Sequence, residues 1–165
     1  MLPILLLFSL ASAPCEGPGV DPWLAGLHQR VTADDGLALF AARAYGEPTA
    51  CEGGVTAEFD GLEFGRMTLT YPGGITLEVE TFPPESSVVT LRAPLGFADA
   101  DVIRGVLRDY VARIGLSVDW STPTVTTEGA DTVHTFHDPL PGLNASASLF
   151  LRDGGIVGVR VSMAP

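Results

Sequence analysis

The chain has 165 residues, of which 46% are hydrophobic, so it is long and apolar enough to form one domain with its own core. Twenty acidic residues oppose nine arginines, and there is no lysine, which gives a formal net charge of −11. Because a negative field of this size repels phosphate groups, we expect neither nucleic acid nor an anionic membrane surface to be a partner. A chain without lysine that is rich in glycine and proline is typical of a GC-rich bacterial genome.

Residues 1–13 form an apolar run that closes on the small residues Ala11-Ser12-Ala13. This pattern is typical of a signal peptide, and we expect cleavage after Ala13. The run is shorter than the roughly 20 residues of a membrane-spanning helix, and no later stretch approaches that length, so no transmembrane segment is predicted in the mature chain. The sequence therefore predicts a periplasmic or extracellular protein. The alternative is a lipoprotein signal, in which acylated Cys15 would anchor the chain to the envelope.

Cys15 and Cys51 are the two cysteines of the chain. An even number of cysteines in an exported protein favours one disulfide, which would tie the mature N-terminus to the body of the domain. In the chain-entropy model such a loop contributes about 3–4 kcal/mol to stability. Acylation of Cys15 would leave Cys51 as a free thiol, so the two interpretations exclude each other.

Two helices are predicted at the start of the mature chain. Asp21 and Pro22 are typical of a helix start, so a short helix that contains His28 is expected there. A second helix is expected to begin at Thr32 and to end at Gly46. Its apolar stripe consists of Leu37, Phe40, Ala41, Ala44 and Tyr45.

The following segment changes to the two-residue period of β-strands. Ile75, Leu77 and Val79 alternate with polar residues, which predicts an antiparallel strand with one face in solvent. Within residues 62–71 the apolar phase slips by one position, which indicates a β-bulge near Gly65. Turn signals at residues 60–61, 73–74, 83–84 and 153–155 divide the chain into about four strands per half.

The second half also begins with a predicted helix. Asp99 is a good N-cap, an apolar stripe continues at helical spacing as far as Ile114, and Gly115 ends the helix. Near the C-terminus the two-residue period returns in residues 157–163, which predicts a final strand.

Four landmarks recur at one nearly constant offset, which indicates a tandem duplication. Gly46 and Gly115 lie 69 residues apart, residues 55–58 and 125–128 lie 70 apart, residues 72–73 and 141–142 lie 69 apart, and residues 89–94 and 160–165 lie 71 apart. We therefore predict a signal peptide over 1–13 and one α+β domain over 14–165, built from two αβ4-type repeats at about 21–94 and 98–165. The helices are expected to pack on one face of an antiparallel sheet. The pattern leaves open whether the halves share one sheet or form two.

His134, His137 and Asp138 are the strongest candidates for chemistry, because two imidazoles and a carboxylate could bind zinc or transfer protons. Residues three apart on a strand point to opposite faces, so the imidazoles could share a metal only if the strand broke between them. We therefore interpret these histidines, like His28, as structural or surface residues. No catalytic residue, metal or cofactor is predicted.

Two further groups have simpler structural interpretations. The acidic pairs at helix starts, Asp34 with Asp35 and Asp99 with Asp101, are expected to cap helices. Aromatic side chains mostly fill the core in a chain of this size, and this is the interpretation for Trp23, Trp120, Tyr71 and Phe82.

The leading hypothesis is an exported, non-catalytic protein that binds another protein or a small apolar ligand. The ligand would lie on the open face of the sheet or in the groove between the repeats, because a seam between two halves is where clefts form. The first alternative is a small secreted hydrolase or metal-dependent enzyme that uses His134, His137 and Asp138. The second is an envelope lipoprotein acylated at Cys15.

Overall fold

A computed structural model describes residues 14–82, 86–140 and 144–164. It contains three α-helices, a short 3-10 turn and eight strands in these ranges. The helices are α1 (Pro22–Asp34), α2 (Gly36–Tyr45) and α3 (Ala100–Arg113). The strands are β1 (Ala50–Phe59), β2 (Leu62–Tyr71), β3 (Ile75–Phe82), β4 (Ser86–Arg92), β5 (Thr124–Glu128), β6 (Asp131–His137), β7 (Asn144–Arg152) and β8 (Gly155–Ala164). The predicted signal peptide and the predicted turn at 83–84 lie outside the described residues.

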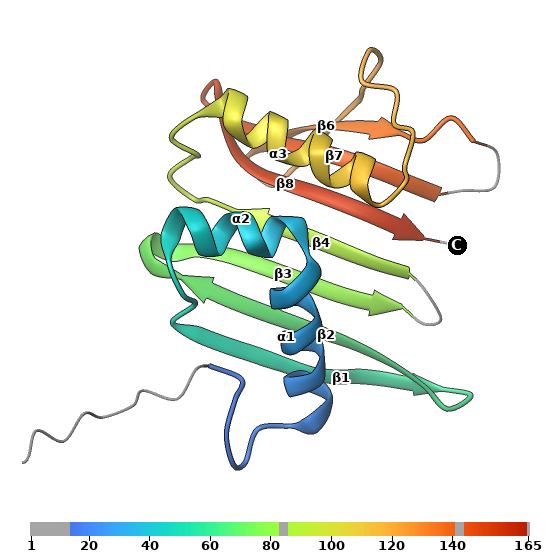
Figure 1. Cartoon of the computed structure of the whole chain (residues 1–165). Coiled ribbons are helices and arrows are strands. Elements are labelled where there is room, and N and C mark those ends of the chain that lie inside the picture. Colours follow the sequence, from blue (N-terminus) through green and yellow to red (C-terminus); the bar gives the residue numbers. More distant parts are fainter. Residues whose placement is uncertain (1–13, 83–85, 141–143, 165) are drawn as a thin grey trace, which may run out of the picture.

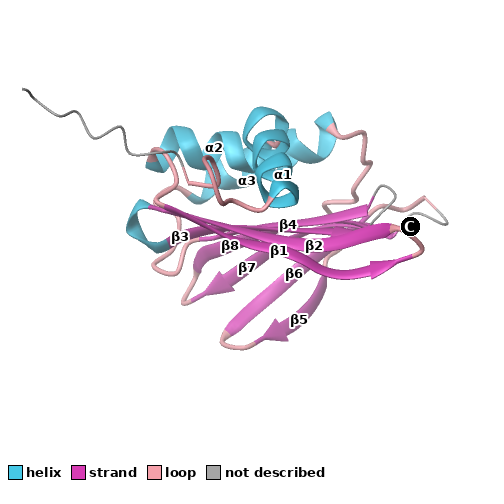
Figure 2. Ribbon diagram, turned by 90° about the horizontal axis from the view of Figure 1, so that it is seen from below, coloured by secondary structure: helices cyan, strands magenta, loops and turns pink. Residues whose placement is uncertain are grey.

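The eight strands form one antiparallel sheet in the order β1-β2-β3-β4-β8-β7-β6-β5. The first half of the chain supplies four consecutive strands, the second half supplies the other four, and the halves meet where β4 pairs with β8. All three helices lie on one side of this sheet (Figures 1 and 2). The prediction of an α+β domain with an antiparallel sheet is therefore confirmed, and the choice between one sheet and two is resolved as one.

Aspartates start all three helices. Asp21, Asp35 and Asp99 each accept two backbone N–H groups of the following helix through the side chain. The prediction that Thr32 starts the second helix is wrong. Thr32 lies inside α1 and its hydroxyl donates to the carbonyl of His28 over 2.7 Å, while Asp35, in an extended conformation, separates α1 from α2. A carboxylate that binds two amides is the stronger cap.

The main core lies between the helices and one face of the sheet. Leu37 of α2 and Ile103 and Leu107 of α3 are fully buried against the strands. The strand residues that meet them follow the two-residue period and include Met67, Leu69, Leu77, Leu91 and Val159. A smaller buried cluster of Val133, Phe150 and Val157 is separate from this core.

The predicted irregularity near Gly65 lies in the opposite strand. The ladder between β1 and β2 shifts between Val55 and Ala57, so the extra residue of the bulge is Thr56 in β1. Gly65 itself is required for another reason, because a Cβ atom at this position would overlap the Trp23 ring. The apolar slip in residues 62–71 therefore indicated a bulge correctly, but the bulge lies in β1 and not in β2.

Cys15 and Cys51 form a disulfide, with Cα atoms 5.6 Å apart. The bridge ties the segment before α1 to β1, at one edge of the sheet. Such a bond fits an oxidising compartment outside the cytoplasm, which agrees with the predicted periplasmic or extracellular location. No helix in the described ranges is long and apolar enough to cross a membrane.

Candidate binding face

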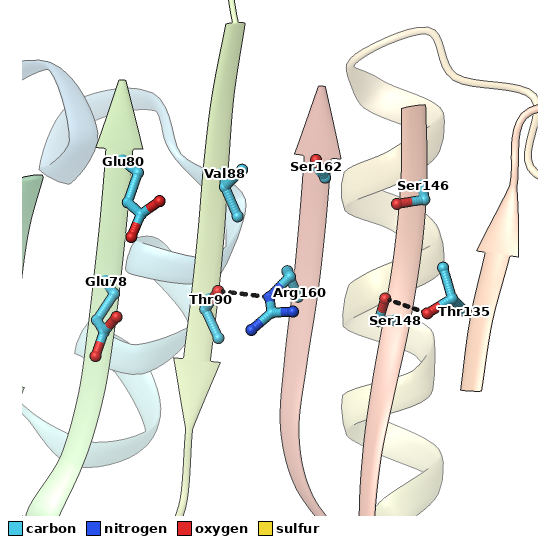
Figure 3. A pocket seen from close by; sticks show the side chains of 9 residues that line it. All are labelled: Glu78, Glu80, Val88, Thr90, Thr135, Ser146, Ser148, Arg160 and Ser162. Atoms are coloured by element: carbon cyan, nitrogen blue, oxygen red, sulfur yellow. Dashed lines mark hydrogen bonds between the residues drawn. The ribbon is translucent and has the colours of Figure 1, made fainter. Parts of the chain in front are cut away.

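The sheet face opposite the helices carries a polar hollow at the junction of the two halves. We call this face, which bears Glu78, Thr90 and Arg160, the open face. The hollow has a volume of about 470 Å³ and extends over β3, β4, β8, β7 and β6 (Figure 3). Its lining consists of Glu78, Glu80, Val88, Thr90, Thr135, Ser146, Ser148, Arg160 and Ser162.

The alternation that builds the core also builds this polar lining. On β3, Leu77 and Val79 are buried under the helices, so Glu78 and Glu80 point to the open face. On β8, Arg160 and Ser162 alternate in the same way with buried valines. Ser146 and Ser148 of β7 complete the pattern from the other side of the junction. Three strand segments with a two-residue period thus place hydroxyl, carboxylate and guanidinium groups on one surface.

Hydrogen bonds within the hollow hold several of these side chains in place. The Nε of Arg160 donates to the hydroxyl of Thr90 over 3.3 Å, and the hydroxyls of Thr135 and Ser148 lie 3.0 Å apart (Figure 3). The surface is therefore ordered before any ligand binds, which lowers the entropy cost of binding.

The uncompensated charge of the hollow is negative. Both terminal nitrogens of Arg160 donate to the carboxylate of Glu128, at 3.1 and 3.0 Å, and this arginine is therefore neutralised within the molecule. Glu80 forms an ion pair with Arg66. Within the described part of the chain Glu78 belongs to no ion pair, so a positively charged group is the complement that this surface favours.

A network of arginines and carboxylates closes the end of the open face near the β5–β6 turn. The buried carboxylate of Asp131 accepts from Arg92 Nη1 at 2.8 Å and from Arg152 Nε at 2.7 Å. The Phe150 ring lies beneath two guanidinium groups, 3.6 Å from that of Arg92 and 4.7 Å from that of Arg160. The hydrogen bond from Arg152 lowers the pKa of Asp131, and the one from Arg160 lowers the pKa of Glu128. Three of the nine arginines of the chain therefore form ion pairs in this network.

The three residues singled out for chemistry do not form one cluster. His134 and His137 lie on one continuous strand, β6, at an odd spacing that directs them to opposite faces. The carboxylate of buried Asp138 accepts from the backbone N–H groups of Ser117 at 2.9 Å and Leu140 at 2.8 Å, so it holds two loops together. The described residues contain no group of three or more His, Cys, Asp or Glu placed to hold a metal ion.

Three of the four aromatic residues expected in the core contact it. Tyr71 is fully buried, Trp23 packs on Gly65, and Trp120 lies 5.1 Å from Phe136 between ring centroids. Phe82 does not follow the prediction, because 39% of it is exposed at the end of β3.

One partly buried carboxylate outside the open face joins two helices. Asp35, the cap of α2, accepts a hydrogen bond from the hydroxyl of Tyr110 in α3. Burial raises the pKa of Asp35, and burial together with this carboxylate raises the pKa of Tyr110. The same environment raises the pKa of Tyr71 to about 12. These shifts follow from packing between α2, α3 and the sheet, and the contact fixes the helix layer.

The sequence contained a signal for the binding face in the polar half of each alternating strand. Glu78, Arg160 and Ser162 stand in the segments whose apolar residues predicted strands. Their convergence depends on the pairing of β4 with β8, whose residues Thr90 and Arg160 are 70 positions apart in the chain. No local pattern predicts that pairing.

Comparison with known proteins found no matching family model, no similar curated protein and no similar solved structure.

Proposed function

We propose that this is an exported, non-catalytic binding protein that holds a protein partner on the open face of its sheet. The observation that carries the proposal is the ordered polar hollow of about 470 Å³ at the junction of β4 and β8. Its hydroxyl groups and the carboxylate of Glu78 suit a partner surface with hydrogen-bonding and positively charged side chains. Such a lining favours a protein surface over the small apolar ligand, because an apolar ligand would leave these polar groups without partners.

The duplication of an αβ4 unit is part of the same proposal. Each half contributes a helix, α2 or α3, followed by four consecutive strands. In both halves the last strand lies at the centre of the sheet and the first strand lies at its edge. Helix α1 has no counterpart among the described residues of the second half. A fused pair of similar units would create the junction on which the hollow lies.

The disulfide supports the proposed location outside the cytoplasm. It also weighs against the lipoprotein alternative, because a Cys15 sulfur that is bonded to Cys51 cannot carry a lipid. For the hydrolase alternative, the amides bound by Asp138 already occupy the carboxylate that the histidines would need.

The experiment that tests the proposal is native mass spectrometry of the protein purified from cells that make it naturally. Ser146→Trp would fill the hollow, whereas Val102→Trp adds the same ring to an exposed position on α3. We expect one partner polypeptide to remain bound to the wild type and to Val102→Trp and to be lost from Ser146→Trp. Circular dichroism checks that both variants fold, and Glu78→Lys provides a second change in the hollow if Ser146→Trp does not.

Retention of the partner by both hollow variants would contradict the proposal. Retention of a small molecule, with no polypeptide, would replace it with the small-ligand hypothesis.

A further inference from the structure

The β1–β2 hairpin has two faces of different chemistry at an edge of the sheet. Among the described residues strand β1 is outermost, so it pairs there on one side only, with β2 (Figure 1). On the open face the hairpin carries Phe59, which is 69% exposed, and its cross-strand partner Leu62, which is 40% exposed. Phe64 and Phe82 continue this surface, with ring centroids 6.4 Å apart. We call these four side chains the hairpin patch.

A second hollow adjoins the hairpin patch. It has a volume of about 370 Å³ and is lined by Thr56, Phe64, Gly65, Arg66, Glu80, Thr81 and Phe82. Large apolar side chains that are exposed together beside a hollow are typical of an interaction site, whereas single exposed ones are ordinary. The hairpin patch therefore has the properties of a surface that is covered by a partner.

The other face of the hairpin is acidic. Glu58 and Glu63 are directly opposite each other in the ladder, and both are exposed. Like charges at such a position destabilise a hairpin. Neither glutamate forms an ion pair with any other residue in the described ranges, and exposed Asp60 at the turn adds a third negative charge. A cationic partner would relieve this repulsion.

We infer that the free edge of β1 binds an extended segment of another polypeptide in which apolar and basic residues alternate. A strand added at this edge places successive side chains on opposite faces. Its apolar side chains would cover Phe59 and Leu62, and its basic side chains would meet Glu58 and Glu63. This inference goes beyond the proposed function, because it uses the edge of the sheet and does not depend on the hollow at the junction of β4 and β8.

A second copy of this chain is the poorer occupant. Pairing β1 with another β1 would add Glu52 and Glu58 of one copy to those of the other, and each copy carries a net charge of −11. Charge complementarity therefore selects a basic partner.

The test uses a synthetic peptide of the sequence KVKFKVKF and the full protein, with affinity measured by calorimetry. Two control peptides contain Glu in place of Lys, or the same residues in an order that does not alternate. We expect binding of the alternating basic peptide alone, weaker binding as salt increases, and slower hydrogen exchange in residues 50–59. Phe59→Ser should weaken binding about tenfold, the loss expected for much of one aromatic contact.

Matched variants locate the site. Glu58→Gln with Glu63→Gln should weaken binding and reduce its salt dependence, whereas Asp109→Asn on α3 and Val125→Ser on the opposite edge strand should leave it unchanged. Equal binding of all three peptides, or slower exchange in β5 and not in β1, would overturn the inference. Dimerisation of the protein that Phe59→Ser abolishes would also overturn it. Ser146→Trp should leave peptide binding intact, so failure here is separate from failure of the proposed function.

Discussion

The two edge hairpins of this sheet finish the open face in different ways. At the β5–β6 end, Asp131 and Glu128 bind arginines from β4, β7 and β8, and the guanidinium groups of Arg92 and Arg160 cover Phe150. At the β1–β2 end, the exposed rings of Phe59 and Phe82 lie on the same face. Figure 2 shows that β5 and β6 bend away from the helix layer.

The difference shows how an acidic chain distributes its few cations. Three arginines stabilise one end of the sheet. The other end carries exposed apolar side chains on one face and, on the opposite face, two glutamates that form no ion pair within the described residues. Covering an apolar cluster with guanidinium groups contributes to stability through burial and cation–π contacts. Leaving such a cluster exposed contributes nothing to the stability of the isolated protein, which is why we assign the β1–β2 end to binding.

The largest effect is expected from comparing phenylalanines at the two ends. Phe150→Ala removes a fully buried ring and should cost about 3–5 kcal/mol of unfolding free energy. Phe59→Ala removes a ring that is 69% exposed and should change stability by less than about 0.5 kcal/mol. Urea denaturation of both variants measures the two free energies. Similar losses would mean that the β1–β2 end is packed in solution.

Reduction should affect the edge that holds the disulfide. Replacing Cys15 and Cys51 together by serine should lower the unfolding free energy by about 3–4 kcal/mol, because the bridge closes a loop with a sequence separation of 36. Removal of the bridge should increase the rate of hydrogen exchange more in β1 than in β5, since the bridge is attached to β1. Unchanged stability after full reduction of the wild type would contradict this role.

Low pH should reduce the stability of the β5–β6 end of the sheet. The pKa of Glu128 is lowered mainly by its hydrogen bond from Arg160, so its contribution is complete above the pKa of the unfolded chain, about 4.3, and is lost as pH falls through the lower folded value. Glu128→Gln should remove a contribution of up to about 1 kcal/mol at neutral pH, since the pair is half-exposed, and none at pH 2. Denaturation at several pH values measures this difference.

Asp35 provides a control of opposite sign. Its pKa is raised by burial, so its contribution falls as pH rises from the unfolded value, about 3.9, through the folded one. The wild type should therefore lose stability as pH rises above about 4, and Asp35→Asn should not show this loss. Glu128→Gln should change the pH profile in the opposite direction. If both variants changed the pH profile in the same direction, the assignment of the two carboxylates would be wrong.

Much of the fold could be predicted from local patterns. The spacing of apolar residues predicts strands β3 and β8, and the turn signals predict the number of strands per half. Aspartates before apolar stripes predict the helix caps at Asp35 and Asp99. Strand β1 gave no such signal, because an edge strand that is exposed from Val55 onward does not need an apolar period. The start of α2 was misplaced because α1 continues through Thr32 and the chain bends only at Asp35.

The candidate sites could be predicted only in part. The polar residues of β3 and β8 were visible as half of an alternation, but their meeting depends on pairing between strands from different halves. The contacts of Asp131 with Arg92 and Arg152 span 39 and 21 residues, and no short motif encodes them. Side chains that converge through sheet order are seen only when that order is known.

Photo-crosslinking can show whether the partner lies on the open face. It would be done in cells that make the protein naturally. A benzophenone amino acid at Ser146 would stand in the hollow, and the same amino acid at Val102 would stand on the exposed side of α3. We expect a crosslink to one partner polypeptide from position 146 and none from position 102. A crosslink from position 102 with none from position 146 would place the partner on the helix layer, and the open face would then not be the binding surface.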